Sequence, residues 1–298
     1  MEGMKNLTPY YSFRQYCLDT FGEKLYRLSL NAGLTCPNRD GTLDSRGCLF
    51  CSAGGSGEFA APASLSIPEQ LEQAKARVAG KFSGRRYVAY FQAYTNTYAP
   101  VERLRELFTP VVEREDIAVL SVATRPDCLP GKVLDLLGEL NRRKPVWVEL
   151  GLQTIHPDTA AYLRRGYDLP CYERAAAELR ARGIHVVTHV ILCLPGEGRE
   201  EMLQTARYVG QHSDGIKLQL LHVLEGTDLA ADYRAGRVPL PTLEEYVALV
   251  RDCVKVLPED MVVHRMTGDG PKRMLLAPQW SGDKKRVLNA LNRALERS

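Results

Sequence analysis

Residues 36–51 read Cys36-Pro-Asn-Arg-Asp-Gly-Thr-Leu-Asp-Ser-Arg-Gly-Cys48-Leu-Phe-Cys51. Three cysteines lie in this one segment, with eleven residues between the first two and two residues between the last two. An iron–sulfur cluster is normally held by four cysteines, so three thiolates leave one iron with an open position. A metal site with an open position can bind a substrate. The segment therefore predicts a catalytic iron–sulfur cluster held by Cys36, Cys48 and Cys51.

Other interpretations of the segment stay open on the residues alone. A disulfide is disfavoured because nothing in the sequence indicates an oxidising compartment. A structural zinc site would need a fourth ligand, and the next cysteine is Cys128, although His, Asp or Glu from elsewhere could complete such a site. The cysteines at 128, 171, 193 and 253 lack ligand-like spacing, and we interpret them as buried thiols.

Composition is that of an ordinary globular protein. The chain has 298 residues, of which 45% are hydrophobic and 25% are charged, enough for one large domain with a substantial core. No apolar run approaches the ~20 residues that span a bilayer. The first residues lack a basic region followed by an apolar stretch, so we expect no secretory signal, no membrane and a cytoplasmic location.

Charge is spread unevenly along the chain. The net charge is +3, but residues 261–298 carry eight Lys or Arg against three acidic residues, which makes this tail +5. A basic tail can face the phosphates of a nucleic acid. It can equally be the solvated face of a helix, and charge alone does not separate the two.

Short apolar strands alternate with amphipathic helices through most of the chain. We expect strands at residues 24–30, 86–92, 117–123, 146–152, 184–192 and 215–223, and helices at 66–81, 101–115, 132–142, 172–182 and 200–210. This alternation predicts a parallel α/β sheet, and six units are two short of a closed barrel. We therefore expect an open, partial (β/α)6 barrel at residues 24–230. A helical segment (1–23) precedes it, and a small α+β extension (231–298), with a helix at 242–257, a strand at 261–266 and a helix at 284–297, closes it.

Polar side chains follow these strands where the strands end. They are Gln92 and Tyr94, Arg125, Gln153, and His222. Parallel barrels carry their chemistry at the C-terminal strand ends, because the loops from all strands meet there.

Alternation within the strands groups further residues. Glu149 lies at even spacing from Gln153 and so faces the same side. His189, Ile191 and Cys193 likewise share one face. A buried carboxylate needs a partner, and for Glu149 we expect a substrate or an arginine.

On these residues the chain resembles the radical SAM enzymes, whose usual cysteine gaps are three and two. The barrel is similar to that of the catalytic subunit of Elongator in four stretches: Val148-Glu-Leu-Gly-Leu-Gln-Thr154, Arg165-Gly166, Thr124-Arg-Pro-Asp127 and Leu194-Pro-Gly196. No acetyltransferase domain follows, so that resemblance covers roughly residues 25–230. Over nearly its whole length the chain resembles the bacterial MnmL (YtqA-like) family, in Cys36-Pro-Asn-Arg-Asp-Gly41, Tyr90-Phe-Gln-Ala-Tyr-Thr-Asn-Thr97 and His264-Arg-Met-Thr-Gly-Asp-Gly-Pro271.

The resemblance implies a [4Fe–4S] cluster on Cys36, Cys48 and Cys51, and S-adenosylmethionine cleaved to a 5′-deoxyadenosyl radical. It implies a cytoplasmic enzyme of tRNA modification that acts at the C5 substituent of the wobble uridine, from carboxymethylaminomethyl towards aminomethyl. The partners implied are tRNA, an electron donor such as flavodoxin or ferredoxin, and a downstream tRNA methyltransferase.

The resemblance also implies roles for residues around S-adenosylmethionine. Phe50 fits the aromatic position beside adenine, and Gln92 and Tyr94 stand where the family usually has a Gly-Gly-Glu-like motif. Arg125 would pair with the methionine carboxylate, or else with Asp127. The further expected cofactor contacts are Gln153 at the ribose, Ile191 and Gln219.

Two other groups of residues complete the expected site. The expected catalytic residues are Glu149, His189 and Arg165, although His189 could be a hydrogen-bonded core histidine. The expected substrate contacts are His222, His264, Arg265, Asp269 and Lys272, most of them around the turn at residues 267–271, which could also be purely structural.

Two alternatives to a tRNA-modifying enzyme remain at this point. One is a radical SAM enzyme that acts on a small molecule or a protein side chain. The other, from a different class, is a zinc-stabilised binding protein without catalysis.

Overall fold

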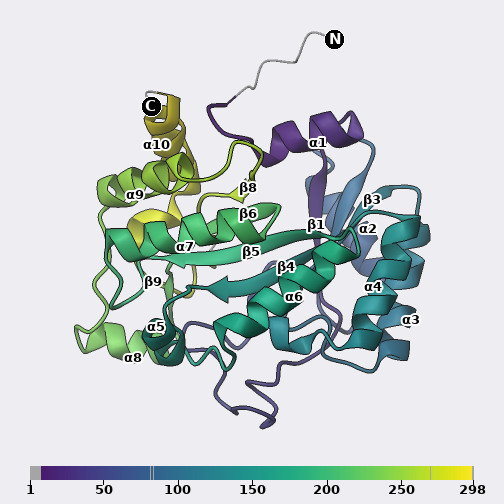
Figure 1. Ribbon diagram of the computed structural model, residues 1–298, viewed down its shortest axis with the longest axis horizontal. Helices are drawn as coiled ribbons and strands as arrows, with labels where there is room; N and C mark the ends of the chain where they lie inside the picture. Colours follow the sequence, from purple (N-terminus) through teal and green to yellow (C-terminus); the bar gives the residue numbers. More distant parts are fainter. Residues whose placement is uncertain (1–7, 81, 83, 269, 297–298) are drawn as a thin grey trace.

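The computed structural model describes residues 8–80, 82, 84–268 and 270–296. Within these residues, seven strands form one curved sheet in the order β1-β2-β3-β4-β5-β6-β8, and each strand runs parallel to its neighbours. The strands are β1 (Tyr26–Leu30), β2 (Tyr87–Phe91), β3 (Ile117–Thr124), β4 (Val146–Gln153), β5 (His185–Leu192), β6 (Gly215–Leu220) and β8 (Val262–Arg265). The predicted α/β class and open barrel are confirmed (Figure 1).

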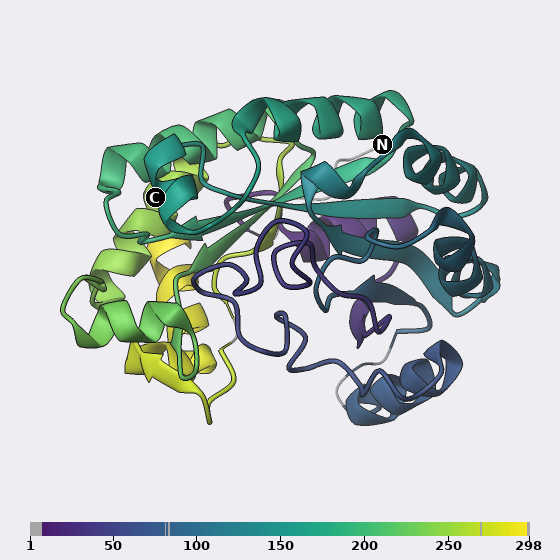
Figure 2. The ribbon, with the colours of Figure 1, turned by 90° about the horizontal axis from the view of Figure 1, so that it is seen from below.

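Helices lie on the outer side of the curved sheet, and the long loop between β1 and α2 crosses its inner side (Figure 2). The helices are α1 (Phe13–Phe21), α2 (Ile67–Val78), α3 (Val101–Glu113), α4 (Gly131–Arg143), α5 (Pro157–Tyr162), α6 (Leu169–Ala181), α7 (Arg199–His212), α8 (Asp228–Arg234), α9 (Leu243–Lys255) and α10 (Lys284–Glu296). Helix α2 begins where the sequence predicts, because the Ser66 side chain and the Glu69 side chain form a reciprocal capping box. In the described part of the chain, no helix is both long enough and apolar enough to cross a membrane.

The sheet has one strand more than the six that the sequence predicts. Strand β8 pairs in parallel with β6, with Gly215 opposite Val262 and Ile216 opposite Val263. The sequence pattern predicts this strand in a separate closing extension, after a helix at residues 242–257. The structure instead brings the chain back to the sheet edge, and a small antiparallel pair, β7 (Val223–Leu224) with β9 (Leu275–Ala277), lies beside it.

Helix α1 covers the end of the barrel at which the strands begin. Its Cys17 is fully buried against Val88, Val119 and Trp147, and Phe13 and Tyr16 pack on the same cluster. The Phe13 and Trp147 rings meet edge to face at 5.9 Å between centroids. This aromatic layer closes the lower end of the barrel, so its interior opens only towards the C-terminal strand ends.

Two histidines are part of this closing layer. The His185 ring stacks on Tyr16 at 5.2 Å, and the His264 ring lies 5.2 Å from Phe13 and 5.5 Å from Trp147. Burial, reinforced by the charge of Arg27, lowers the pKa of both imidazoles below the ordinary histidine value. Both rings are therefore neutral inside the folded protein near neutral pH.

The neutral histidines predict a pH-dependent stability. In the unfolded chain these imidazoles take up protons as the pH falls through about 6.5, whereas the folded chain resists uptake until lower pH. At low pH the unfolded state therefore binds more protons than the folded state, so the free energy of unfolding decreases as the pH decreases. Denaturant titration at several pH values gives the slope of the free energy of unfolding against pH. In a His185→Phe variant this slope should be smaller, by up to about 1.4 kcal/mol per pH unit. A Tyr16→Phe control should keep it, and equal slopes in wild type and His185→Phe would contradict the prediction.

Candidate active site

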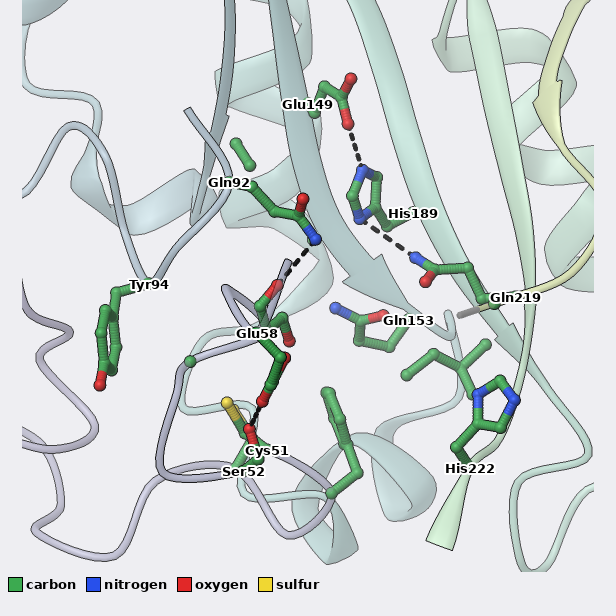
Figure 3. Close-up of a pocket in the computed structure, with 18 of the residues that line it drawn as sticks. Cys51, Ser52, Glu58, Gln92, Tyr94, Glu149, Gln153, His189, Gln219 and His222 are labelled. Atoms are coloured by element: carbon green, nitrogen blue, oxygen red, sulfur yellow. Dashed lines mark hydrogen bonds and ion pairs between the residues drawn. The ribbon is translucent and has the colours of Figure 1, made fainter. Parts of the chain in front are cut away.

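A cavity of about 330 Å³ opens at the C-terminal ends of the strands. Side chains from β1 to β6 line it, together with the cysteine loop and the turn after β8. Figure 3 shows its two ends: Cys51, Ser52 and Glu58 lie at one end, and Glu149 and His189 lie at the other. Three glutamines, Gln92, Gln153 and Gln219, lie between the two ends.

The cysteine loop is held by contacts to distant parts of the chain. The Asn38 side chain donates to the Arg164 carbonyl at 2.7 Å and to the Cys48 sulfur at 3.3 Å. The Leu49 amide donates to the Leu163 carbonyl at 3.1 Å, just beyond α5. The loop is therefore fixed against the chain after β4, and its thiols face the cavity.

The chemistry of the three thiols fits an iron–sulfur cluster. Cys36, Cys48 and Cys51 all line the cavity. Burial raises the pKa of Cys48 to about 11 and also raises the pKa of Cys51, whereas neighbouring cations, Arg125 for Cys48 and Arg39 for Cys51, act in the opposite direction. Cations and an amide donor beside buried thiols favour an anionic thiolate cluster over neutral thiols.

The same thiols do not form a site for one metal ion. Among the described residues, no three His, Cys, Asp or Glu side chains come together as they would around a single ion. Each thiolate of a [4Fe–4S] cluster binds a different iron, so a cluster site is wider than a zinc site. The arrangement gives no support to the zinc alternative.

Three strand ends carry residues with left-handed backbone. Tyr94 has φ +58°, Gln153 has φ +69° and Cys193 has φ +67°. Non-glycine residues adopt this conformation at a cost, and such residues cluster at functional sites. At Gln153 the side chain points into the cavity (Figure 3). The prediction that Cys193 shares a face with His189 and Ile191 is wrong. His189 and Ile191 line the cavity and Cys193 does not, because its left-handed backbone breaks the strand alternation.

The residues after β2 hold the glycine-rich segment at 54–57. Gln92 accepts a hydrogen bond from Ser29 at 3.0 Å and donates to the Ser56 carbonyl at 2.7 Å. The Tyr94 hydroxyl donates to the Ala53 carbonyl at 2.5 Å, and the Tyr94 amide donates to the Gly55 carbonyl at 2.9 Å. Gln92 and Tyr94 thus fix the wall of the cavity beside the cysteines.

Arg125 lines the cavity but is already paired. Its guanidinium makes two hydrogen bonds to the Asp127 carboxylate, at 2.9 and 2.8 Å, and lies 5.0 Å above the Tyr167 ring. The expected alternative, an ion pair with Asp127, is the one that the structure contains. Arg125 therefore adds a fixed positive charge close to the cysteines.

Glu149 is the centre of a buried polar network at the closed end of the cavity. It forms an ion pair with Lys217 and accepts hydrogen bonds from Ser121 at 2.9 Å and from His189 at 2.7 Å. The other nitrogen of His189 lies 3.2 Å from the Gln219 amide. We expected an arginine or a substrate as the partner of Glu149. Arg27 does form an ion pair with Glu149 at 3.9 Å, and Lys217, which the sequence did not single out, lies closer.

Charge and burial set the protonation of this network. Burial alone would raise the pKa of Glu149, but Lys217, His189 and Arg27 outweigh it and hold that pKa well below its usual range. Burial, with the charge of Lys217, lowers the pKa of His189 to about 4. Near neutral pH the network thus contains an ionised Glu149 and a neutral His189.

Most of the predicted site residues meet at this one cavity. Of the predicted residues that the structure describes, those that line it are Cys36, Cys48, Phe50, Cys51, Gln92, Tyr94, Arg125, Glu149, Gln153, His189, Ile191, Gln219, His222 and Arg265. Their separate roles stay predictions.

Three predicted residues lie elsewhere. Arg165 is buried outside the cavity, where its guanidinium donates to the carbonyls of Leu152 and Thr154 and stabilises the chain after β4. His264 lies in the aromatic layer at the opposite end of the barrel, because it belongs to strand β8 and not to the turn at residues 267–271. Lys272 is exposed and does not line the cavity. Asp269 lies outside the described residues.

The sequence analysis missed several residues of the site, above all Lys217, Arg39, Asn38 and Glu58. Lys217 lies two residues before Gln219 on the same strand face, so alternation could have found it. Asn38 and Arg39 lie inside the cysteine loop itself. Glu58 directly follows the glycine-rich segment, where no pattern singles it out.

The glycine-rich segment at 54–57, which follows the cysteine loop, requires a glycine at position 55. Gly55 has φ +58°, and a Cβ there would lie 2.3 Å from the Tyr94 ring. Gly55→Ala should therefore cost on the order of 1–3 kcal/mol of backbone strain and displace the wall beside the thiols. Iron and sulfide retained after anaerobic reconstitution should fall. Gly80→Ala, where a Cβ would meet nothing within 4 Å, is the matched control; equal iron content in both variants would contradict the prediction.

Comparison with known families gives a match over most of the chain. The Radical SAM superfamily matches residues 42–209, and the Radical_SAM C-terminal domain matches residues 213–297. The protein YtqA of Bacillus subtilis (strain 168) is 45% identical over 288 residues, which are 96% of this chain and 89% of that protein.

A more distant relative and a solved structure agree with this assignment. The tRNA uridine(34) acetyltransferase of Methanocaldococcus jannaschii is 24% identical over 161 residues, 53% of this chain and 29% of that protein. The structure of Methanocaldococcus infernus Elp3 with an N-terminal deletion has a TM-score of 0.68 at 15% identity, covering 90% of this chain and 63% of that one, which shows a shared fold. The chain belongs to the radical SAM superfamily, and it is a radical SAM enzyme that uses a [4Fe–4S] cluster and S-adenosylmethionine.

Proposed function

We propose that this enzyme modifies tRNA at the C5 substituent of the wobble uridine, converting carboxymethylaminomethyl towards aminomethyl. The observation that carries the proposal is the likeness of the barrel to a protein named tRNA uridine(34) acetyltransferase. The resemblance to the MnmL (YtqA-like) family implies the same substrate class, and the chain is 45% identical to YtqA over nearly its whole length. The proposal includes a cytoplasmic location, an external donor such as flavodoxin or ferredoxin, and a tRNA methyltransferase acting afterwards.

The cysteine end of the cavity would hold the cofactors. Cys36, Cys48 and Cys51 would bind the cluster, with Asn38 donating to the Cys48 sulfur and Arg39 offsetting negative charge at Cys51. When bound, the cluster and S-adenosylmethionine supply one-electron cleavage of the sulfonium and a carbon radical that removes hydrogen from the substrate.

Residues between the two ends of the cavity would orient the nucleoside part of S-adenosylmethionine. Phe50 would contact adenine, together with Ile191 of the hydrophobic cluster against which Phe50 packs. Gln153, held in a left-handed conformation with its amide pointing inwards, would bind the ribose. Gln92 and Tyr94 bind the glycine-rich segment and so exclude water from this side.

The closed end of the cavity would receive the substrate base. A base inside a folded anticodon must leave its stack before it can enter a buried pocket. His189 and Gln219 form a continuous hydrogen-bonded wall with Glu149, which would orient the substituent of the flipped base. His222, after β6, and Arg265, on β8, line other parts of the same cavity.

The cluster ligands give the first test. Cys48→Ala should lose most of the about four irons and four sulfides per chain found after reconstitution, and with them the formation of 5′-deoxyadenosine. Cys171→Ala, on the outer helix α6, should keep both. Iron analysis and chromatography of the products measure the two effects. Undiminished 5′-deoxyadenosine from Cys48→Ala would refute the assigned ligands.

The substrate gives the second test. A strain that lacks this gene should accumulate carboxymethylaminomethyluridine in its tRNA and lose the aminomethyl form and its methylated product, as measured by mass spectrometry of tRNA nucleosides. A gene copy carrying Cys171→Ala should restore the pattern, and one carrying Cys48→Ala should not. Unchanged wobble uridines in the deletion strain would exclude the proposed substrate.

A further inference from the structure

Asn38 lies inside the cysteine loop, and its side chain is buried behind the cavity. The residue is 1% exposed and does not line the cavity. Its side-chain amide nitrogen lies 3.3 Å from the Cys48 sulfur and 2.7 Å from the Arg164 carbonyl oxygen. A carbonyl oxygen only accepts hydrogen bonds, so the nitrogen of the Asn38 amide, and not its oxygen, faces these two atoms. Each of its two N–H groups therefore has one partner.

The contacts around Asn38 fix the direction of this donor. The Asn38 carbonyl accepts from the Gly47 amide at 2.7 Å, which closes the loop immediately before Cys48. On the other side lies Gly166, where a Cβ would be 3.0 Å from the Asn38 side-chain oxygen. Gly166 has φ +82°, so both its backbone conformation and this close approach favour glycine. The Asn38 amide is therefore held in one orientation, towards the Cys48 sulfur.

The Cys48 sulfur needs a donor at this position because a carbonyl oxygen lies beside it. The Arg164 carbonyl oxygen is 3.8 Å from that sulfur, a contact that a neutral thiol makes as a weak donor. A thiolate that binds iron has no S–H group, so its negative sulfur and the carbonyl oxygen would repel each other. The Asn38 amide donates to both atoms and so offsets this repulsion.

We infer that Asn38 is a positioning residue that raises the reduction potential of the iron–sulfur cluster. The inference rests on the proposed ligand Cys48. Reduction adds negative charge to a cluster and its sulfurs, and hydrogen bonds to those sulfurs are among the features that set its potential. A donor beside the Cys48 sulfur stabilises the more negative, reduced state more than the oxidised one. An external electron donor would therefore reduce the cluster more easily.

The neutrality of Asn38 makes this effect separable from that of the nearby cations. Leucine has a similar shape and no N–H group, so Asn38→Leu removes the hydrogen bond without changing the charge near the thiols. Arg125 beside Cys48 and Arg39 beside Cys51 stay in place. A change in potential can therefore be assigned to the lost donor.

The test is a redox titration of the reconstituted holoenzyme, in which electron paramagnetic resonance measures the reduced cluster without S-adenosylmethionine. In Asn38→Leu, the ratio of reduced to oxidised cluster at a fixed solution potential should fall by up to about tenfold, the range for one hydrogen bond. For a one-electron couple, this lowers the midpoint potential by up to about 59 mV. The dissociation constant of S-adenosylmethionine should change little, because Asn38 does not line the cavity.

Asp228→Asn is the matched control. Asp228 is the first residue of α8 and pairs with the Arg164 guanidinium at 2.6 Å, so this variant loosens the same segment and leaves the donor at Cys48 in place. Its midpoint should equal that of wild type. An unchanged midpoint in Asn38→Leu, or an equal fall in both variants, overturns the inference. A complete cluster in Cys48→Ala would instead reject the proposed ligand.

A second measurement decides the matter if Asn38→Leu loses its cluster. Wild-type protein is labelled with nitrogen-15 only in the side-chain amides of asparagine, reduced, and studied by pulsed electron paramagnetic resonance. Among the described residues, Asn38 is the asparagine that donates to a cysteine sulfur. A hyperfine coupling between nitrogen-15 and the cluster electron supports the inference, and its absence overturns it.

Discussion

A carboxylate buried in the middle of a barrel must be neutralised, and the way Glu149 is neutralised organises the interior of this enzyme. Ser121 on β3, His189 on β5 and Lys217 on β6 all bind it. Four strands are therefore joined across the inside of the sheet as well as along their edges. In a low-dielectric interior these contacts are strong when complete and costly when broken, so the closed end of the cavity is a rigid surface.

Rigidity there depends on the layer beneath. Phe13, Tyr16 and Trp147 pack with the neutral rings of His185 and His264 across the lower end of the barrel, beneath the polar network. A layer permeable to water would screen Glu149 from its partners and weaken each contact. The aromatic layer and the polar network are thus two parts of one arrangement: the first excludes water, and the second uses the resulting low dielectric.

Much of this architecture follows from patterns that can be read along the chain. Strand alternation predicts that Glu149 and Gln153 face one side, and the cysteine spacing predicts a three-thiol site; the structure brings both groups to one cavity. Sequence reasoning fails where a contact joins strands that are not neighbours. Glu149 on β4 meets Lys217 across β5, and nothing local marks that pair.

Backbone conformation is the second limit. The alternation of β5 predicts that Cys193 faces the cavity, yet its left-handed backbone turns it away. The positive φ angle of Cys193 is imposed by the folded environment and is not visible in the sequence. His264 shows a related limit: the predicted strand at residues 261–266 contains it, but which of its side chains face the cavity depends on the pairing with β6, which the sequence pattern does not give.

The cavity has two chemically different ends, and their separation matters for a radical enzyme. The three thiols and the cations Arg39 and Arg125 lie at one end, while Glu149 lies at the other, bound to Lys217 and His189. A reactive radical must meet one hydrogen atom and no other. Rigid groups remote from the cofactors, such as the network around Glu149, would hold that atom in place without a contact at the atom itself.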